Sequence, residues 1–411
     1  MRLEIVSVAL SFGASSLYWL VSALRMDAAV YGGMMQLQAL LLTCVAVFSL
    51  RTHDLVFHLQ AHHGRPLRTA YLNTLQLELA LTVIASACCL VLALLGVFGV
   101  LASSGVSPAL WAAAGLLANL TILQGASAAY LRGNHMDRRV AWADLLTALA
   151  WGAALVSALT LRAPAPWWIL GIGFAAGAVR PLALTGFALA GAWRQSPDEA
   201  AASICLPPLN RRQLGRFLVA GQFTNLLKNN LLSLETLLLG RLAGADQVAL
   251  FRVARSLLGL ATVLLNISYQ KAFRALAASQ EPGQRQQVIR RMTRSSLMLW
   301  AGSLPIIFAA GLAFVHLKGG THYSGLLLVL AVAALASLPL ALQQSDFAAL
   351  SLDGRFGRIN LAYSLAFGLL LLGCLTWSDR MSALLFLALS AAAGLLRFAL
   401  LRWPPSQPKP Q

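Results

Sequence analysis

Residues 323–376 read YSGLLLVLAVAALASLPLALQ, then QSDFAALSLDGRFGRIN, then LAYSLAFGLLLLGCLT, and this order of segments decides the fold. Two apolar runs, 323–343 and 361–376, flank a polar gap that contains Arg355 and Arg358. A helix of about 20 apolar residues crosses a hydrocarbon core that is ~30 Å thick. Each run is therefore expected to span a membrane, with the basic gap outside the hydrocarbon.

Basic residues follow the same alternation along all 411 residues of the chain. Of the 31 Lys and Arg residues, 21 lie at the two termini or in five alternate gaps, which are 51–69, 131–139, 191–216, 271–294 and 344–360. The intervening gaps hold only five, which are Arg25, Arg162, Arg241, Lys318 and Arg380. Lys and Arg are enriched in cytoplasmic loops. Both ends of the chain are therefore expected in the cytoplasm.

The sequence predicts an all-α polytopic membrane protein with about twelve transmembrane helices. The predicted spans are 5–24, 30–50, 70–102, 109–130, 140–161, 167–190, 217–239, 248–270, 295–315, 323–343, 361–376 and 381–401. A hydrophobic content of 58% and a mean hydropathy of +0.71 agree with this class. The first run is long enough to span and lacks a clear cleavage site, so it is taken as a helix and not as a signal peptide. The net charge of +17 is spread over short loops that face anionic lipid, which argues against nucleic acid as a partner.

The longest polar stretch, Gly191–Arg216, divides the chain into two halves of six spans. It contains Ser-Pro and Pro-Pro steps, which are typical of a linker. The predicted domains are an N-terminal six-helix bundle (1–190), a cytoplasmic linker (191–216), a C-terminal six-helix bundle (217–403) and a cytoplasmic tail (404–411). Two related halves are a common transporter plan.

A transporter is favoured over a membrane-embedded enzyme. The outward loops are short, whereas polysaccharide polymerases and lipid-linked glycosyltransferases usually carry substantial outward loops with catalytic residues. No nucleophile or metal-ligand spacing compensates, and the five cysteines suggest neither a disulfide frame nor a zinc site. The histidines between residues 53 and 63 indicate an interfacial amphipathic segment and not a metal site. No cofactor is expected.

The stretch 217–260, FLVAGQFTNLLKNNLLSLETLLLGRLAGADQVALFRVARSLLGL, carries a family resemblance. It resembles the seventh and eighth spans of polysaccharide-export flippases of the multidrug/oligosaccharidyl-lipid/polysaccharide (MOP) superfamily. The shared pattern is an acidic residue, a LLLG-x-LxG turn and an aromatic helix start, filled here by Glu235–Gly240, Leu242–Gly244 and Phe251–Ala254. Residues Leu350–Arg358 look like the Gly-Arg turn of that family.

The resemblance implies two six-helix bundles around a central lumen that opens alternately to each side of a bacterial plasma membrane. The expected cargo is a polyprenyl-diphosphate-linked oligosaccharide for envelope polysaccharide (O-antigen, capsule or exopolysaccharide) synthesis, with coupling to an H⁺ or Na⁺ gradient. Anionic membrane lipid and the glycan polymerase machinery are the other expected partners. The alternatives are a drug/cation antiporter of the same superfamily and a membrane-embedded polymerase or glycosyltransferase.

Cations inside the spans are the candidate substrate ligands, because each ionisable side chain in a bilayer costs roughly 2.5–3.5 kcal/mol on insertion scales. Lys228 lies eleven residues after Phe217, which places it ~16 Å into the seventh span and near the midplane. Arg255 lies one turn from Arg252 on the same helix face. Guanidinium groups pair well with phosphate. We therefore expect Lys228, Arg252 and Arg255 to bind the diphosphate, although the two arginines can instead snorkel to the outer head groups.

Glu235 and Arg180 complete the candidate site. Glu235 lies near the outer end of the seventh span, at about the depth of Arg252, so it is either a salt-bridge partner or a coupling-ion site. Arg180 precedes Pro181 in the sixth span, where it either lines the lumen as a substrate ligand or snorkels beside a kink.

Three other ionisable residues within the spans have local explanations. Glu78 and Asp144 are expected to pair with nearby basic loops. Arg397 is expected to snorkel to the cytoplasmic interface.

The charge pattern makes a topology prediction. A cysteine that replaces Arg290 should be cytoplasmic and should not react with an impermeant thiol reagent added to intact cells. Cysteines at Arg162 and Lys318 should react. Labelling of the Arg290→Cys variant from outside would contradict the twelve-span arrangement.

Overall fold

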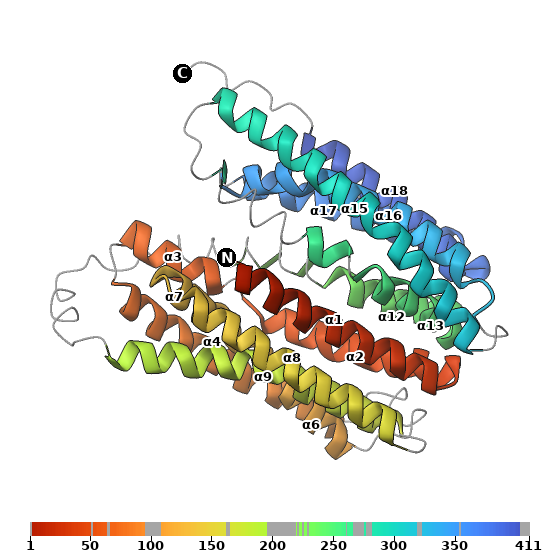
Figure 1. Ribbon diagram of the computed structural model, residues 1–411, viewed down its shortest axis with the longest axis horizontal. Helices are drawn as coiled ribbons and strands as arrows, with labels where there is room; N and C mark the ends of the chain where they lie inside the picture. The colour runs from red at the N-terminus through yellow and green to blue at the C-terminus, as the bar shows by residue number, and fades with distance from the viewer. Residues whose placement is uncertain are drawn as a thin grey trace. The chain divides into compact units, whose positions relative to one another are not determined.

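The computed structural model describes residues 2–50, 52–63, 66–94, 108–161, 165–194, 219, 222–223, 226–227, 230–259, 261–265, 275–276, 282–318, 323–352 and 355–402. Within these ranges the regular elements are α-helices and short 3₁₀ turns, and no strand occurs (Figure 1). The predicted all-α class is confirmed.

Ten described helices are long and apolar enough to cross a membrane. They are Val6–Arg25, Ala28–Phe48, Leu67–Leu92, Ala109–Gly133, Asp137–Thr160, Pro166–Arg194, Gly283–Lys318, Leu326–Leu350, Phe356–Thr376 and Ala383–Arg402. They coincide with the first six and the last four predicted spans. The predicted spans 217–239 and 248–270 include residues outside the described ranges, and their described parts overlap α12 (Leu231–Ala243) and α13 (Ala245–Leu257).

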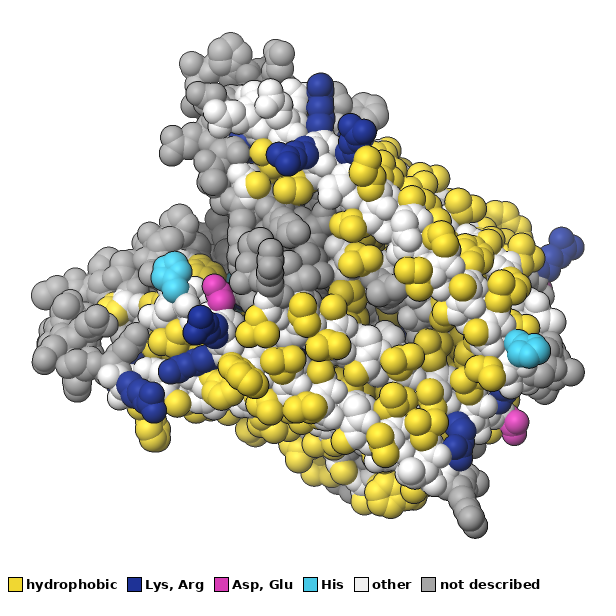
Figure 2. Space-filling model, in the orientation of Figure 1, with side chains coloured by type: hydrophobic (Ala, Val, Ile, Leu, Met, Phe, Trp, Pro, Cys, Tyr) yellow, Lys and Arg dark blue, Asp and Glu magenta, His cyan; other side chains and the backbone are white. Residues whose placement is uncertain are grey.

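Apolar side chains cover much of the face shown in Figure 2, and Lys and Arg side chains gather in groups near helix ends. Leu149 and Leu375 are examples of large apolar side chains that are 71% and 74% exposed. Extended exposed apolar surface of this kind is typical of helices that contact lipid.

Several helices continue beyond the predicted span boundaries. The predicted gap 344–360 is largely helical, because α16 (Leu326–Leu352) ends well inside it and α17 (Phe356–Thr376) begins there. Helix α15 (Pro282–Lys318) has 37 residues, or ~55 Å of helix, and includes the basic residues of the predicted gap 271–294 that follow Pro282. Charges mark where the hydrocarbon ends, whereas helical hydrogen bonding continues into the head-group region.

The chain forms two compact units, Met1–Leu237 (unit 1) and Leu238–Gln411 (unit 2). The boundary falls within α12. Most of the predicted linker, residues 195–216, lies outside the described ranges, so the domain limits stay predictions. A lumen between the two bundles also stays an expectation.

In unit 1, α1 (Arg2–Arg25) packs against α8 (Asp137–Thr160), and α8 packs against α9 (Pro166–Arg194). The Tyr18 hydroxyl donates a hydrogen bond to the Ile169 carbonyl. Trp19 lies edge-on to Tyr18, with ring centroids 4.9 Å apart. A Cβ at Gly173 would lie 2.8 Å from the Trp19 ring, so the close packing of α1 on α9 depends on this glycine.

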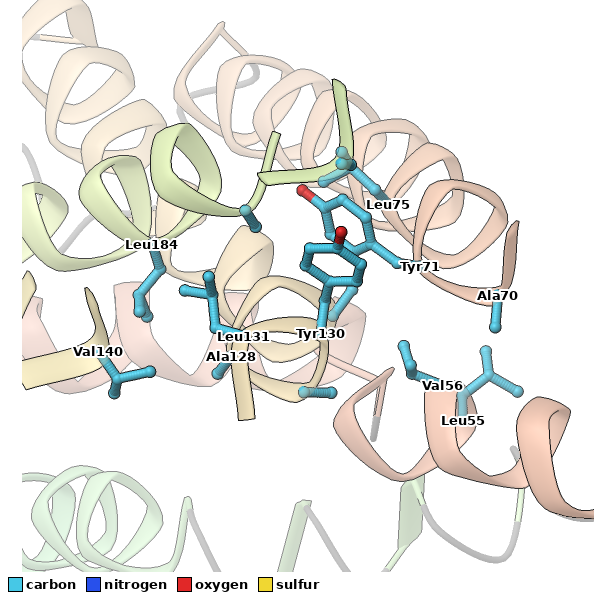
Figure 3. Close-up of a cluster of buried hydrophobic side chains, with 14 of the residues drawn as sticks. Leu55, Val56, Ala70, Tyr71, Leu75, Ala128, Tyr130, Leu131, Val140 and Leu184 are labelled. Atoms are coloured by element: carbon cyan, nitrogen blue, oxygen red, sulfur yellow. The ribbon is translucent and has the colours of Figure 1, made fainter. Parts of the chain in front are cut away.

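A second apolar cluster in unit 1 joins α3 (Thr52–His63), α4 (Leu67–Leu94), α7 (Gln124–Gly133) and α9. Figure 3 shows the stacked rings of Tyr71 and Tyr130, whose centroids are 4.6 Å apart. Leu55 and Val56 of α3 are buried in this cluster. The expected segment of the first cytoplasmic loop is thus a helix that is packed onto the bundle.

In unit 2, α15 packs against α16, and α18 (Ala383–Arg402) packs against both α16 and α17 (Figure 1). Gly373 permits the close contact of α17 with α18, because a Cβ there would lie 2.6 Å from Leu389. The Gln247 side chain accepts a hydrogen bond of 2.9 Å from the Ala383 N–H at the start of α18. Gly244 joins α12 to α13 with φ of 84°, a conformation that favours glycine.

The aromatic stack predicts a stability effect. Tyr130→Ala should lower the free energy of unfolding by about 3 kcal/mol, because a fully buried ring would leave a cavity among packed helices. Thermal unfolding of the purified protein in detergent measures this loss. The exposed Leu149→Ala is the control, and equal losses in the two variants would refute the assignment of the core.

Candidate functional site

The fourth span is interrupted, and this interruption organises the polar residues of unit 1. Helix α6 (Pro108–Asn119) passes into a 3₁₀ turn, η1 (Leu120–Leu123), and α7 begins at Gln124. The Asn119 side chain donates a hydrogen bond of 3.3 Å to the Ser86 hydroxyl. A 3₁₀ stretch within a helix changes which backbone groups are paired. The first N–H groups of α7 are therefore accessible to side chains of neighbouring helices.

Arg180 links three helices at this level. Its Nε lies 2.7 Å from Oδ1 of Asp144 on α8, and its Nη1 lies 2.8 Å from Oε1 of Gln124 on α7. The Asp144 side chain is 3% exposed and that of Arg180 is 31% exposed. A buried ion pair is tolerated when further hydrogen bonds satisfy its remaining polar groups. Gln124 meets this need, and the three residues form the Arg180 triad.

Glu78 of α4 is fully buried beside the same interruption. Its Oε1 accepts hydrogen bonds from the Thr52 hydroxyl (2.5 Å) and from the Ala126 N–H (2.8 Å). Its Oε2 has no hydrogen-bond partner among the described residues. Gly125 allows this approach, because a Cβ there would lie 2.1 Å from Oγ1 of Thr52 and 2.9 Å from Oε1 of Glu78.

Unit 2 contains a corresponding group around Arg397 of α18. The Arg397 Nε donates a hydrogen bond of 3.0 Å to Oε1 of Gln343 on α16. The guanidinium carbon lies 4.7 Å from the ring centroid of Tyr363 on α17. These residues form the Arg397 triad, in which a cation–π contact takes the place of an ion pair.

The two triads occupy equivalent positions in the two halves of the chain. Arg180 and Arg397 each lie fourteen residues after the first residue of α9 and α18, respectively. Asp144 and Tyr363 each lie seven residues after the first residue of α8 and α17. Gln124 precedes Asp144 by the same interval as Gln343 precedes Tyr363. The triads are thus an internal repeat.

Neighbouring contacts also recur in both halves. Ser127 and Thr185 have their hydroxyl oxygens 3.2 Å apart, and the equivalent pair in unit 2 is the salt bridge of Asp346 with Arg402 at 2.8 Å. Arg139 and Arg358, each the third residue of its helix, donate hydrogen bonds of 3.1 Å to carbonyls of α9 and α18, and the two acceptors, Phe187 and Leu400, differ in register by one helical turn. The fourth, fifth and sixth helices of each half therefore share one packing pattern.

The acidic residues are not repeated. In unit 1, Glu78 accepts a hydrogen bond from the N–H of Ala126, the second residue after Gln124. In unit 2, the second residue after Gln343 is Ser345, and its hydroxyl oxygen lies 2.8 Å from that of Thr293. Thr293 and Tyr363 thus stand where unit 1 has Glu78 and Asp144. Both halves keep the arginine and the glutamine, and only the first half carries the acids.

Sequence reasoning missed Gln124, Gln343 and Tyr363, although a signal was present. The sixth span contains Ala175-Ala-Gly-Ala-Val-Arg180, and the twelfth contains Ala392-Ala-Gly-Leu-Leu-Arg397. This repeated AAG-x-x-R pattern aligns the two arginines.

Snorkelling was one expectation for Arg180 and the expectation for Arg397, and it stays a prediction for both, but the structure adds side-chain partners for each. Each guanidinium is held by side chains of two neighbouring helices, which span spacing does not reveal. Asp144 pairs with Arg180 of another span and not with a basic loop. A substrate-binding role for Arg180 stays a prediction.

For the other predicted site residues, the structure leaves the proposed roles as predictions. Lys228 lies outside the described residues. Glu235 and Arg252 are both buried, but they belong to different units, so their pairing stays a prediction. The Arg255 guanidinium lies 5.4 Å from the Phe251 ring centroid. The substrate role of Lys228, Arg252 and Arg255 and the ion role of Glu235 are untested expectations. No group of three potential metal ligands occurs in the described part of the chain.

Solved structures reveal what this architecture resembles. An inward-facing multidrug-resistance MATE transporter of the MOP superfamily superposes with a TM-score of 0.61, at 13% identity over 96% of this chain and 94% of that chain. A MATE structure in the bent conformation gives 0.62, at 12% identity over 98% of this chain and 93% of that chain. The chain has the fold of the MATE transporters. A MOP-superfamily transporter from Pyrococcus furiosus gives 0.58, at 13% identity over 98% and 94% of the two chains. No protein-family profile and no curated protein sequence matches the chain.

Within this MATE-type fold, the Arg180 triad predicts a double-mutant effect. Arg180→Met alone should lower the stability by roughly 3–5 kcal/mol, because it leaves the Asp144 carboxylate buried without its ion partner. The double variant Arg180→Met with Asp144→Leu should recover most of this loss. Thermal unfolding in detergent measures both, and additive losses would show that the pair is not coupled.

Proposed function

We propose that this protein is a MOP-superfamily transporter that works by alternating access and is driven by protons. It would span a bacterial plasma membrane with both termini in the cytoplasm. The MATE-type fold supports transport, and the excess of basic residues in alternate loops supports this orientation. As proposed, the protein moves its cargo without a catalysed reaction and is not an enzyme.

The buried carboxyl group of Glu78 carries the proton coupling in this proposal. Its Oε1 is fixed by Thr52 and by Ala126, and its Oε2 has no hydrogen-bond partner in the described part of the chain. An ionised carboxylate in a low-dielectric interior is costly unless it is well paired. A proton on Oε2 removes the charge without displacing either donor.

Protonation of Glu78 would also change the packing around the interruption of the fourth span. The ionised carboxylate accepts charge-assisted hydrogen bonds, which are about twice as strong as neutral ones. It also lies at the N-terminus of α7, where a negative charge is stabilised. Proton binding weakens both effects, so it loosens the contacts of α4 with α3 and with α7. This gives a physical route from proton binding to helix movement.

Two kinds of cargo fit a transporter of this fold. Export of a drug or organic cation is supported by the multidrug-resistance MATE transporter among the structures of the same fold. The two buried carboxyl groups of unit 1, Glu78 and Asp144, agree with the exchange of a cation for protons.

Translocation of a polyprenyl-diphosphate-linked oligosaccharide is the second candidate. It is supported by the resemblance of residues 217–260 to polysaccharide-export flippases and by the basic residues in the last six spans. Lys228, Arg252, Arg255 and Arg180 would contact the diphosphate, and the glycan polymerase machinery would receive the product. The same-fold transporter from Pyrococcus furiosus is described as having a binding pocket of reverse polarity that suggests a different function, so pocket polarity differs within this fold.

Proteoliposomes test the coupling. With a pH gradient that is acidic outside, the wild-type protein should move protons inward when cargo is present, and Glu78→Gln should abolish this flux because it cannot ionise. Glu78→Asp should keep part of it. Full proton-coupled transport by Glu78→Gln would refute the proposal.

Transport assays in the same proteoliposomes identify the cargo. Uptake of a fluorescent organic cation supports the antiporter, and translocation of a labelled polyprenyl-diphosphate sugar supports the flippase. Gel filtration of each variant verifies that a loss of transport does not come from misfolding.

A further inference from the structure

The internal repeat leaves Arg397 without the acid that neutralises Arg180. In unit 1 the guanidinium of Arg180 shares its charge with Asp144 at 2.7 Å. In unit 2 the equivalent position holds Tyr363, whose ring lies beneath the Arg397 guanidinium. A ring face orients a cation but does not cancel its charge. Arg397 is partly exposed, and Gln343 is its only hydrogen-bond partner among the described residues.

Arg397 forms no salt bridge with a described acid of unit 2. Asp346 forms a salt bridge with Arg402. Asp246 lies in the first turn of α13. Asp379 precedes α18, so its position is roughly 20 Å from that of Arg397 along the helix axis.

A second guanidinium lies along the same face of α18. Nη2 of Arg255 lies 3.5 Å from the hydroxyl oxygen of Ser390. Ser390 and Arg397 are seven residues apart, so they share a helix face and are separated by about 10 Å along the axis. Two cationic groups are thus placed along one face of a membrane-spanning helix.

We propose that the Arg397 triad binds a phosphate or diphosphate group of the cargo. Gln343 and Tyr363 hold the guanidinium, and its two terminal amino groups donate to phosphate oxygens in one plane. The planar fork matches two oxygens of a phosphate, and the interaction is strengthened in a low-dielectric environment. This inference rests on the proposed transport function and favours the phosphate-bearing cargo over an organic cation.

The two units differ in their acidic residues, and this difference explains why the proposed site takes an anion. Unit 1 carries Glu78, which can take up a proton, and Asp144, which neutralises Arg180. Unit 2 keeps the arginine and lacks both acids, so it can take up an anion. One duplicated framework thereby supplies two sites of opposite polarity.

Binding to the full-length protein in detergent tests the proposal without any proton gradient. Farnesyl diphosphate is the lipid-like probe, and inorganic pyrophosphate is the free-phosphate probe, both followed by isothermal titration calorimetry. Arg397→Gln should weaken the binding of farnesyl diphosphate by about tenfold or more, because a charge-assisted hydrogen-bonding group is lost. Arg397→Lys should keep part of the affinity, since it keeps the charge.

Tyr363→Asp and Tyr363→Phe form a matched pair. The aspartate copies the acid of the Arg180 triad, which the repeated framework already accommodates in unit 1, and should weaken binding as much as Arg397→Gln does. The phenylalanine keeps the ring and adds no charge, so it should retain most of the affinity. Arg380→Gln, an exposed arginine near the opposite end of α18, is the control and should bind like the wild type.

The outcomes separate clearly. Wild-type binding that is lost in Arg397→Gln and in Tyr363→Asp supports the site. If pyrophosphate binds as tightly as farnesyl diphosphate, the ligand is a free phosphate compound, and otherwise it is a lipid head group. Wild-type affinity in a folded Arg397→Gln, or no binding of either probe, would overturn the proposal. If Arg397→Gln does not fold, equal affinities of Tyr363→Asp and Tyr363→Phe would overturn it instead. Failure of proton coupling in the Glu78 variants is a separate result, because binding requires no gradient.

Discussion

A charged side chain inside a bilayer is costly unless its neighbours compensate the charge, and this cost shapes the centre of unit 1. Arg180 lies within a membrane-spanning helix and reaches Asp144 and Gln124 on two other helices. Its position fixes the relative register of α7, α8 and α9 more strictly than apolar packing does, because apolar side chains tolerate small shifts and an ion pair of 2.7 Å does not. The interruption of the fourth span at η1 fits this register, since it brings Gln124 and the Ala126 N–H to the level where their partners lie.

The sequence predicted the spans well where the physical signal is strong. About 20 apolar residues are required for each crossing, so the first six and the last four spans followed from composition. Helix ends were less well predicted, because α15 and α16 continue past the charges that mark the hydrocarbon boundary. The charges of Arg180 and Asp144 were recognised as costly, but their pairing was not predicted. It depends on which helix faces meet, and span spacing does not contain that information.

The glutamines were missed for a different reason. Gln124 and Gln343 are uncharged and lie near predicted span ends, where polar residues are ordinary. Their role emerges only when the two halves are compared, because each accepts a hydrogen bond from an arginine at the same place in the sixth helix of its half. The role of Tyr363 was also missed, since an aromatic residue in an apolar run is normally interpreted as part of the hydrophobic core.

Duplication explains why the two arginine triads differ in charge and not in geometry. After duplication, the contacts that hold the fourth, fifth and sixth helices together must be kept in both halves. This requirement accounts for the repeated glutamine, the repeated arginine and the paired contacts of Arg139 and Arg358 with carbonyls. The residue at the Asp144 and Tyr363 position can change if it still supports the guanidinium, either as an ion partner or as a ring face. The net charge of each half can then diverge without a change in helix packing, and a single framework can serve one site for a proton and another for an anion.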